Sequence, residues 1–140
     1  MRARREHVLT GSPYEELAGY ARAVVVGDGI YVSGTVGYDF ATGTLPETAE
    51  GQAEQALDTI AWALGEARAE LMDVVRVRVF VPDPDDVGAV SAVLKRRLGQ
   101  ARPANTTVCT PLAVPGCKVE IEVDAIRGSG IAQDDRHDTK

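Results

Sequence analysis

Two stretches near the start of the chain have the apolar, β-branched character of strands. They cover residues 21–26 and 30–35, with Gly-Asp-Gly at residues 27–29 between them. Asp-Gly between two such runs is a strong hairpin signal, because glycine tolerates the positive φ that a tight turn requires. We therefore expect a two-stranded hairpin, preceded by a short strand at residues 7–10.

An apolar residue recurs every three or four positions further along the chain, which predicts an amphipathic helix with one buried side. Gly51 and Gly65 lower the helix propensity without interrupting the pattern. Trp62 lies off the stripe, so we expect it either to cover a subunit boundary or to be partly exposed. The stripe consists of Ala53, Ala56, Leu57, Ile60, Leu64, Ala67 and Leu71.

Strict alternation at residues 73–81 predicts a strand with two distinct faces. One face should carry Val75, Val77, Val79 and Val81, and the other Val74, Arg76, Arg78 and Phe80.

Pro82 ends this strand, and a second helix should follow. Asp83 is a suitable N-cap, and proline is tolerated at the first helical position, where Pro84 stands. The apolar stripe of this helix is Val87, Val90, Leu94 and Leu98.

Two more strands are expected at residues 104–110 and 118–126. The tail, residues 128–140, is polar and lacks periodic apolar residues, so we expect it to be disordered and the domain to cover residues 1–127. The last strand should place Val119, Ile121, Val123 and Ala125 on one face and Glu120, Glu122 and Asp124 on the other.

This order of elements, without a repeat or a long linker, predicts a single α+β domain in which two helices cover one face of a mixed sheet. The opposite face then carries the arginines of one strand and the acids of another. Solvent wets such a face, or partner subunits cover it with the charges paired. The residues alone leave both possibilities open.

The composition of the chain argues against several classes of function. The net charge of −6 argues against a nucleic-acid partner, which requires clustered Lys and Arg. No apolar run approaches the roughly 20 residues that span a bilayer, and no signal-peptide core is present. We therefore expect a cytoplasmic protein without a membrane partner.

Metal and cofactor chemistry also lacks support in the sequence. Cys109 and Cys117 do not have metal-ligand or redox spacing, and we expect both to be small buried or half-buried hydrophobes. His7 and His137 lie near the termini, which disfavours a catalytic triad or a histidine zinc site. No glycine-rich phosphate loop occurs. We expect neither a metal nor a cofactor.

Three short segments identify a family. Residues 102–108 read Arg-Pro-Ala-Asn-Thr-Thr-Val, residues 119–122 read Val-Glu-Ile-Glu, and residues 31–34 read Tyr-Val-Ser-Gly. In this order and spacing the chain resembles the Rid (YjgF-like) family of reactive intermediate imine deaminases, over residues 12–127. The resemblance implies a chorismate-mutase-like fold, a homotrimer with ligand clefts between subunits, and cofactor-independent hydrolysis of small imines and enamines.

The resemblance assigns the chemistry to Glu120, the first acid of the Val-Glu-Ile-Glu segment, which is implicated in positioning the attacking water. A carboxylate in a partly desolvated cleft has its pKa raised toward neutrality, which suits it to proton transfer. Without the resemblance, a strand acid paired with Arg76 or Arg78 is the simpler interpretation.

The resemblance also places Tyr20, Tyr31, Ser33 and Gly34 at the substrate cleft. Tyr31 taken alone is more typical of cross-strand packing. Thr106 and Thr107 offer hydroxyls that either hold a water or only favour the strand.

Asn105 stands where deaminating members of the family have the arginine that holds the substrate carboxylate. Arginine offers a charged, bidentate fork, whereas asparagine offers one neutral amide. We therefore expect poor activity on standard 2-imino acids and a substrate that is another small imine, enamine or carbonyl compound.

Three alternatives stay open. Asn105 either binds a neutral ligand or satisfies a loop backbone, and Arg102 either substitutes as the cation or is solvated or paired in a trimer. The protein as a whole is either an enzyme or a non-enzymatic trimer that binds a metabolite or acts as a scaffold.

Overall fold

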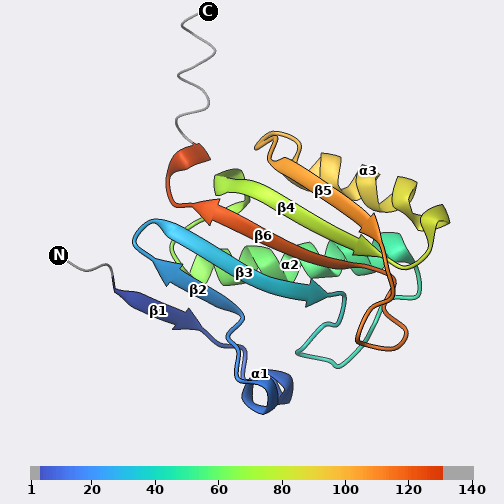
Figure 1. The fold of residues 1–140 in the computed structure, drawn as a ribbon, viewed down its shortest axis with the longest axis horizontal. Coiled ribbons are helices and arrows are strands. Elements are labelled where there is room, and N and C mark those ends of the chain that lie inside the picture. Colours follow the sequence, from blue (N-terminus) through green and yellow to red (C-terminus); the bar gives the residue numbers. More distant parts are fainter. Residues whose placement is uncertain (1–3, 131–140) are drawn as a thin grey trace, which may run out of the picture.

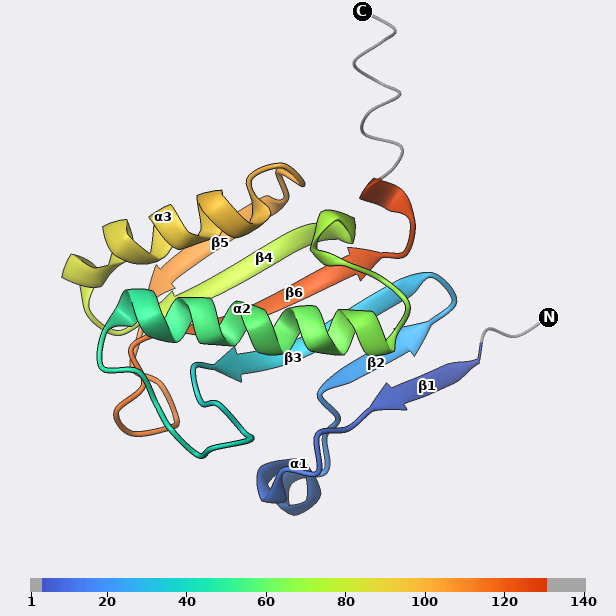
Figure 2. The same ribbon diagram turned by 180° about the vertical axis from the view of Figure 1, so that it is seen from behind.

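The computed structural model describes residues 4–130, which form one six-stranded sheet with two long helices on a single face (Figures 1 and 2). The strand order is β1-β2-β3-β6-β4-β5, and every neighbouring pair is antiparallel except β4 and β5. The predicted α+β fold, with a mixed sheet covered by helices on one face, is confirmed. The strands are β1 (Arg5–Val8), β2 (Ala23–Val26), β3 (Gly29–Val36), β4 (Val74–Val81), β5 (Ala104–Cys109) and β6 (Glu120–Ile126).

The two long helices are α2 (Ala49–Glu66) and α3 (Val87–Leu98), and both bury the apolar stripe that the sequence predicts. Leu71 lies beyond α2, in a separate 3₁₀ turn η1 (Leu71–Asp73). The second helix begins later than expected. Asp83 caps a 3₁₀ turn η2 (Pro84–Asp86) by accepting a hydrogen bond from the amide of Asp85, and α3 follows directly.

A short helix α1 (Pro13–Ala18), which the apolar pattern does not reveal, lies at one end of β1 and β2 (Figure 1). Ser12 caps it, and Gly19 ends it in the left-handed conformation, with φ of 70°. Six residues are too few for a periodic stripe, so only these capping residues indicate the helix in the sequence.

The hairpin of β2 and β3 forms as predicted, with Val26 opposite Gly29 and the turn at Gly27 and Asp28. Gly27 has φ of 60°, as such a turn requires.

Val74 and Val75 lie on the faces opposite to those predicted from strict alternation. Val74 is 2% exposed, whereas Val75 is 38% exposed. The pairing of β4 with β6 shifts in register between Val74 and Arg76, so Val75 is the extra residue of a β-bulge. Alternation predicts every face correctly after the bulge, because the register is regular from there on.

Two further expectations need correction. Cys109 is exposed on β5, although Cys117 is buried as predicted. Ser129 and Gly130, which we assigned to the tail, are held by Asp73: its backbone carbonyl accepts from the Ser129 hydroxyl at 3.3 Å, and its carboxylate accepts from the Gly130 amide at 3.1 Å. The ordered domain therefore extends to Gly130, and the rest of the predicted tail lies outside the described residues.

None of the helices within residues 4–130 is both long enough and apolar enough to cross a membrane. The cytoplasmic location stays a prediction.

A close contact joins the end of β3 to α2. A Cβ atom added to Gly37 would lie 2.6 Å from the Cα of Gln52, so only glycine fits there. Gln52 is buried, donates to the carbonyl of Pro46 at 2.8 Å and accepts from the amide of Lys118 at 2.7 Å. This side chain thereby ties the loop before α2 to the segment that leads into β6.

We predict that Gly37→Ala destabilises the protein by about 1–3 kcal/mol, the usual cost of overpacking a rigid site. The neighbouring atoms are helix backbone and cannot move aside. Gly65→Ala is the matched control: an added Cβ there meets nothing within 4 Å, and alanine favours a helix over glycine by about 1 kcal/mol. Urea unfolding should show opposite signs for the two variants, and equal effects would contradict this reading of the Gly37 contact.

Candidate functional site

Glu120 begins β6 on the sheet face that α2 and α3 leave open. It lies between Val36 of β3 and Phe80 of β4. Its carboxylate lies against Gly34, since a Cβ added there would come within 2.8 Å of the Oε2 atom of Glu120. Two residues predicted for the site therefore meet, and a side chain at position 34 would displace the carboxylate from its present place.

Burial raises the pKa of the Glu120 carboxyl above its ordinary range. The positive charge of Arg22 opposes this shift in pKa, and the negative charge of Glu122 adds to it. Within the described residues, no hydrogen bond or ion pair involves the Glu120 carboxylate. Arg78 instead lies 3.7 Å from Glu122 and 3.5 Å from Asp124, so the simple pairing of Glu120 with Arg78 does not occur.

Tyr20 and Ser33 line the same hollow of about 500 Å³ at the end of β2, beside α1. The Ser33 hydroxyl donates to the carbonyl of Ala21 at 2.7 Å. Tyr31 is on the open face but opposite Asp124, four residues along β6 from Glu120, and its ring lies against Gly29. Within one subunit, Tyr31 is therefore not brought together with Glu120.

Asn105 lies on the other face of the sheet. It pairs with Val77, whose side chain is buried under the helices, while Glu120 belongs to the open face. Asn105 lines a groove of about 240 Å³ between β5 and α3, together with Thr107, Ser91 and Lys95. Its side-chain oxygen accepts from the Thr107 hydroxyl at 2.9 Å rather than from a loop amide.

Thr106 and Arg102 are separated from this groove. Thr106 pairs with Arg78 and so faces the open side of the sheet. Arg102, in the left-handed conformation with φ of 50°, lines a different hollow with Met72 and Val74. Arg102 is thus not beside Asn105 in the pocket where a substitute cation is needed.

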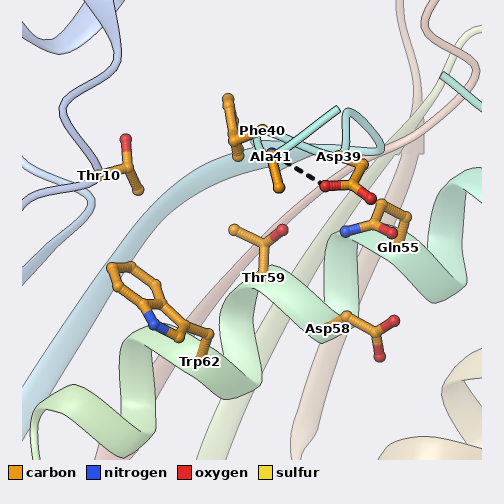
Figure 3. A pocket seen from close by; sticks show the side chains of 8 residues that line it. All are labelled: Thr10, Asp39, Phe40, Ala41, Gln55, Asp58, Thr59 and Trp62. Carbon is orange, nitrogen blue, oxygen red and sulfur yellow. Dashed lines mark hydrogen bonds between the residues drawn. The ribbon is translucent and has the colours of Figure 1, made fainter. Parts of the chain in front are cut away.

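A third hollow, of about 400 Å³, lies on the helix side between α2 and the loop after β3 (Figure 3). Trp62 is 44% exposed at its rim, and its expected place at a subunit boundary stays a prediction. Both carboxylates that line this hollow have partners within the chain. Asp39 accepts a hydrogen bond from the Ala41 amide at 3.0 Å, and Asp58 forms an ion pair with Arg97 at 2.9 Å. The hollow is on the face opposite to Glu120 and does not belong to the candidate site.

Metal ligands do not gather at any of these places: within the described part of the chain, no three or more His, Cys, Asp and Glu side chains lie close enough to hold an ion.

Residues 11–127 match the family model described as Endoribonuclease L-PSP. The chain belongs to the Rid (YjgF-like) family. The 2-iminobutanoate/2-iminopropanoate deaminase of Capra hircus is 33% identical over 125 residues, which cover 89% of this chain and 91% of the relative.

Solved structures of Rid-family proteins share the fold over nearly the whole chain. Rv2704 of Mycobacterium tuberculosis, a member of the YjgF/YER057c/UK114 family, is 38% identical, with a TM-score of 0.81 over 88% of this chain and 99% of that protein. The YjgF gene product of E. coli is 27% identical, with a TM-score of 0.78 over 87% of this chain and 98% of that protein.

Sequence reasoning missed one residue of this Rid-family site. Arg22 is 4% exposed and lies close enough to Glu120 to influence its pKa. The available signal was a charged residue next to the apolar run of β2, a position where a solvated side chain is not expected.

We predict that Glu120→Gln stabilises the folded protein at neutral pH. The folded-state pKa of Glu120 is raised, so the native state binds its proton more tightly than the unfolded state does, and stability falls as pH rises from the ordinary glutamate range through the raised value. We expect a gain of roughly 1 kcal/mol or less at pH 7, because water screens part of the carboxylate. The gain should shrink toward pH 4.

Urea unfolding at the two pH values measures this difference. Glu47→Gln, on an exposed loop side chain, is the control and should leave stability nearly unchanged. A loss of stability in Glu120→Gln at pH 7 would contradict the desolvation argument.

Proposed function

We propose that this Rid-family chain is a cofactor-independent hydrolase of small imines, enamines or related carbonyl compounds. The observation that carries the proposal is the Glu120 carboxylate, half-buried, raised in pKa, and held against Gly34 without an ion-pair partner among the described residues. Relatives named 2-iminobutanoate/2-iminopropanoate deaminase support this class of reaction.

The chemistry needs one group that moves a proton. In its ionised form, Glu120 accepts a proton from water as the water oxygen bonds to the imine carbon. The proton then passes to the nitrogen to give a tetrahedral carbinolamine. Transfer of the hydroxyl proton to the same nitrogen lets this adduct collapse to a carbonyl compound and ammonia or an amine. A carboxyl whose pKa lies nearer neutrality is suited to both transfers.

The proposed function requires a homotrimer in which each ligand cleft is formed by residues of two neighbouring subunits. Glu120 and Asn105 are on opposite faces of one sheet, so a single cleft containing both must take them from two chains. The open face also exposes apolar side chains, which partner subunits would cover in such a trimer. These are Val26, Tyr31, Val75, Val108 and Ile126.

We predict a mass of three chains in sedimentation equilibrium at micromolar concentration. Val108→Glu, which places a charge among these apolar groups, should shift the protein toward monomers, whereas Glu47→Gln should not. A compact monomer for the unmodified chain would contradict the trimer and the composite cleft together.

Asn105 sets the proposed specificity. Without a charged fork, a substrate carboxylate loses a charge-assisted bond worth roughly 1.5–3 kcal/mol, or about 10- to 100-fold in binding. We therefore propose that substrates lack the carboxylate next to the C=N group and that 2-imino acids react poorly.

We predict that Asn105→Arg increases turnover of 2-iminopropionate by about 10-fold or more, because it restores the charged fork. Asn105→Arg combined with Glu120→Ala should lose the gain. Release of ammonia measures both. Robust turnover by the unmodified protein would contradict this specificity, and Lys95→Gln would then show whether the lysine in the same groove is the substitute cation.

The second candidate is a non-enzymatic trimer that binds a metabolite in the same clefts or acts as a scaffold, which the neutral Asn105 favours over a deaminase of 2-imino acids. Thermal-shift screening with small imines, enamines and carbonyl compounds, followed by turnover assays on the ligands found, separates the two functions. Ligands that bind at these clefts and are never converted would support the second.

RNA is not our proposed substrate, although the family description mentions a ribonuclease. The net charge of −6 repels a polyanion. On the open face, β6 carries three acids whereas β4 carries only two arginines, so these two strands also carry a net negative charge.

A further inference from the structure

Arg22 is a buried arginine that enters no step of the proposed reaction. It lies directly before β2, and its Nη1 atom donates to the carbonyl of Gly34 at 3.2 Å and to the hydroxyl of Thr35 at 3.0 Å. Its own carbonyl accepts from the amide of Ser33 at 2.9 Å. The side chain and the main chain of one residue thus hold the same short segment of β3.

That segment is the irregular part of the strand. The pairing of β3 with β6 shifts in register between Val32 and Thr35, so Ser33 and Gly34 form a bulge. Thr35 adds to its geometry by donating to the carbonyl of Ser33 at 2.8 Å. The bulge is also where the Glu120 carboxylate lies against Gly34. Arg22 therefore contacts the backbone on which Glu120 rests.

The guanidinium is enclosed by groups that suit a cation. Its Nε atom is 3.7 Å from the carboxylate of buried Glu15, which is itself held by the amide and hydroxyl of Thr10. Tyr20 presents its ring at 5.6 Å from the guanidinium carbon. Nε is nevertheless buried without a hydrogen bond. Replacing a buried ion pair by well-packed apolar side chains is often neutral for stability, so stability alone does not require an arginine at this position.

The charged groups around Glu120 show what this cation does. Glu122 on the same strand and Cys117 just before it are coupled to Glu120, and Glu122 raises the pKa of Glu120 along with burial. Arg78 is nearby but pairs with Glu122 and Asp124. Arg22 is the group whose charge lowers the pKa of Glu120.

We propose that Arg22 is a positioning residue for Glu120: it holds the bulge of Ser33 and Gly34 in the shape against which the carboxylate lies, and it places a buried positive charge beside that same bulge. The inference rests on the proposed function for its catalytic meaning. The consequence of this placement is that the charge of Arg22 favours the ionised, proton-accepting form of Glu120, against the effects of burial and of Glu122.

The test compares Arg22→Gln and Arg22→Lys with Arg127→Gln. Arg127 also donates to backbone carbonyls and pairs with Asp28, but at the hairpin end of the sheet, so it controls for loss of a structural arginine. Carbon-13 labelling of glutamate allows the Glu120 carboxyl to be titrated by NMR, with its signal assigned by its absence in Glu120→Gln.

We expect Arg22→Gln to raise the pKa of Glu120, because the substitution removes a nearby opposite charge. Arg22→Lys keeps the charge and should shift the pKa less, and Arg127→Gln should not shift it. An unchanged titration in folded Arg22→Gln would overturn the proposal. Should Arg22→Gln fail to fold, the neutral variant Arg22→Met takes its place, since an unchanged titration of Glu120 in that variant would overturn the proposal equally.

Turnover provides a separate measurement once a substrate imine is found. The acidic limb of the pH–rate profile should move to higher pH in Arg22→Gln, with kcat reduced on that limb and KM little changed, since the ionised fraction of a base falls as its pKa rises. A shifted NMR titration without any turnover would leave the role of Arg22 in place and overturn the hydrolase function instead.

Discussion

The sheet of this protein is covered by helices on one face only, and most other features follow from that constraint. Strand side chains alternate between faces, so the apolar half of β4 and β6 must meet α2 and α3. The remaining half, which includes two arginines and three acids, is then forced onto the open face. Charged side chains are concentrated on that face because burying them in the core would cost free energy.

One acid on this face differs from the others in its surroundings. Glu122 and Asp124 lie near Arg78, whereas Glu120 is placed at the end of β6 against a bulge in β3. Burial raises its pKa, and Arg22 limits the rise. A buried arginine and a desolvated carboxylate both cost stability, and such costs are typical of sites shaped for function rather than for folding.

The separation of Asn105 from Glu120 gives the proposed trimer a chemical meaning. β5 is an edge strand, and Asn105 projects from it toward α3, away from the open face. No side-chain movement carries it through the sheet to Glu120. A site that uses both residues is complete only when a second chain brings its own edge strand to the first.

Hydrophobic periodicity and short sequence motifs were sufficient to predict much of the fold and the family. Period-two and helical spacings predicted the strands of the sheet and the buried stripes of α2 and α3, and the motifs predicted the family, because both depend on local sequence. What they missed depends on irregular or distant contacts. The bulge at Val75, the short helix α1 and the packing of Gly130 on Asp73 leave little periodic signal.

Strand order and register decided three features of the candidate site. They are the contact between Glu120 and Gly34, the burial of Arg22 and the placement of Asn105 on the opposite face. Glu120 and Gly34 are far apart in the chain and meet because β6 inserts between β3 and β4. The sequence by itself determined which residues are available for chemistry. Only the tertiary structure decided which of them meet, because the face of a side chain and its neighbours across a sheet depend on pairings between distant segments.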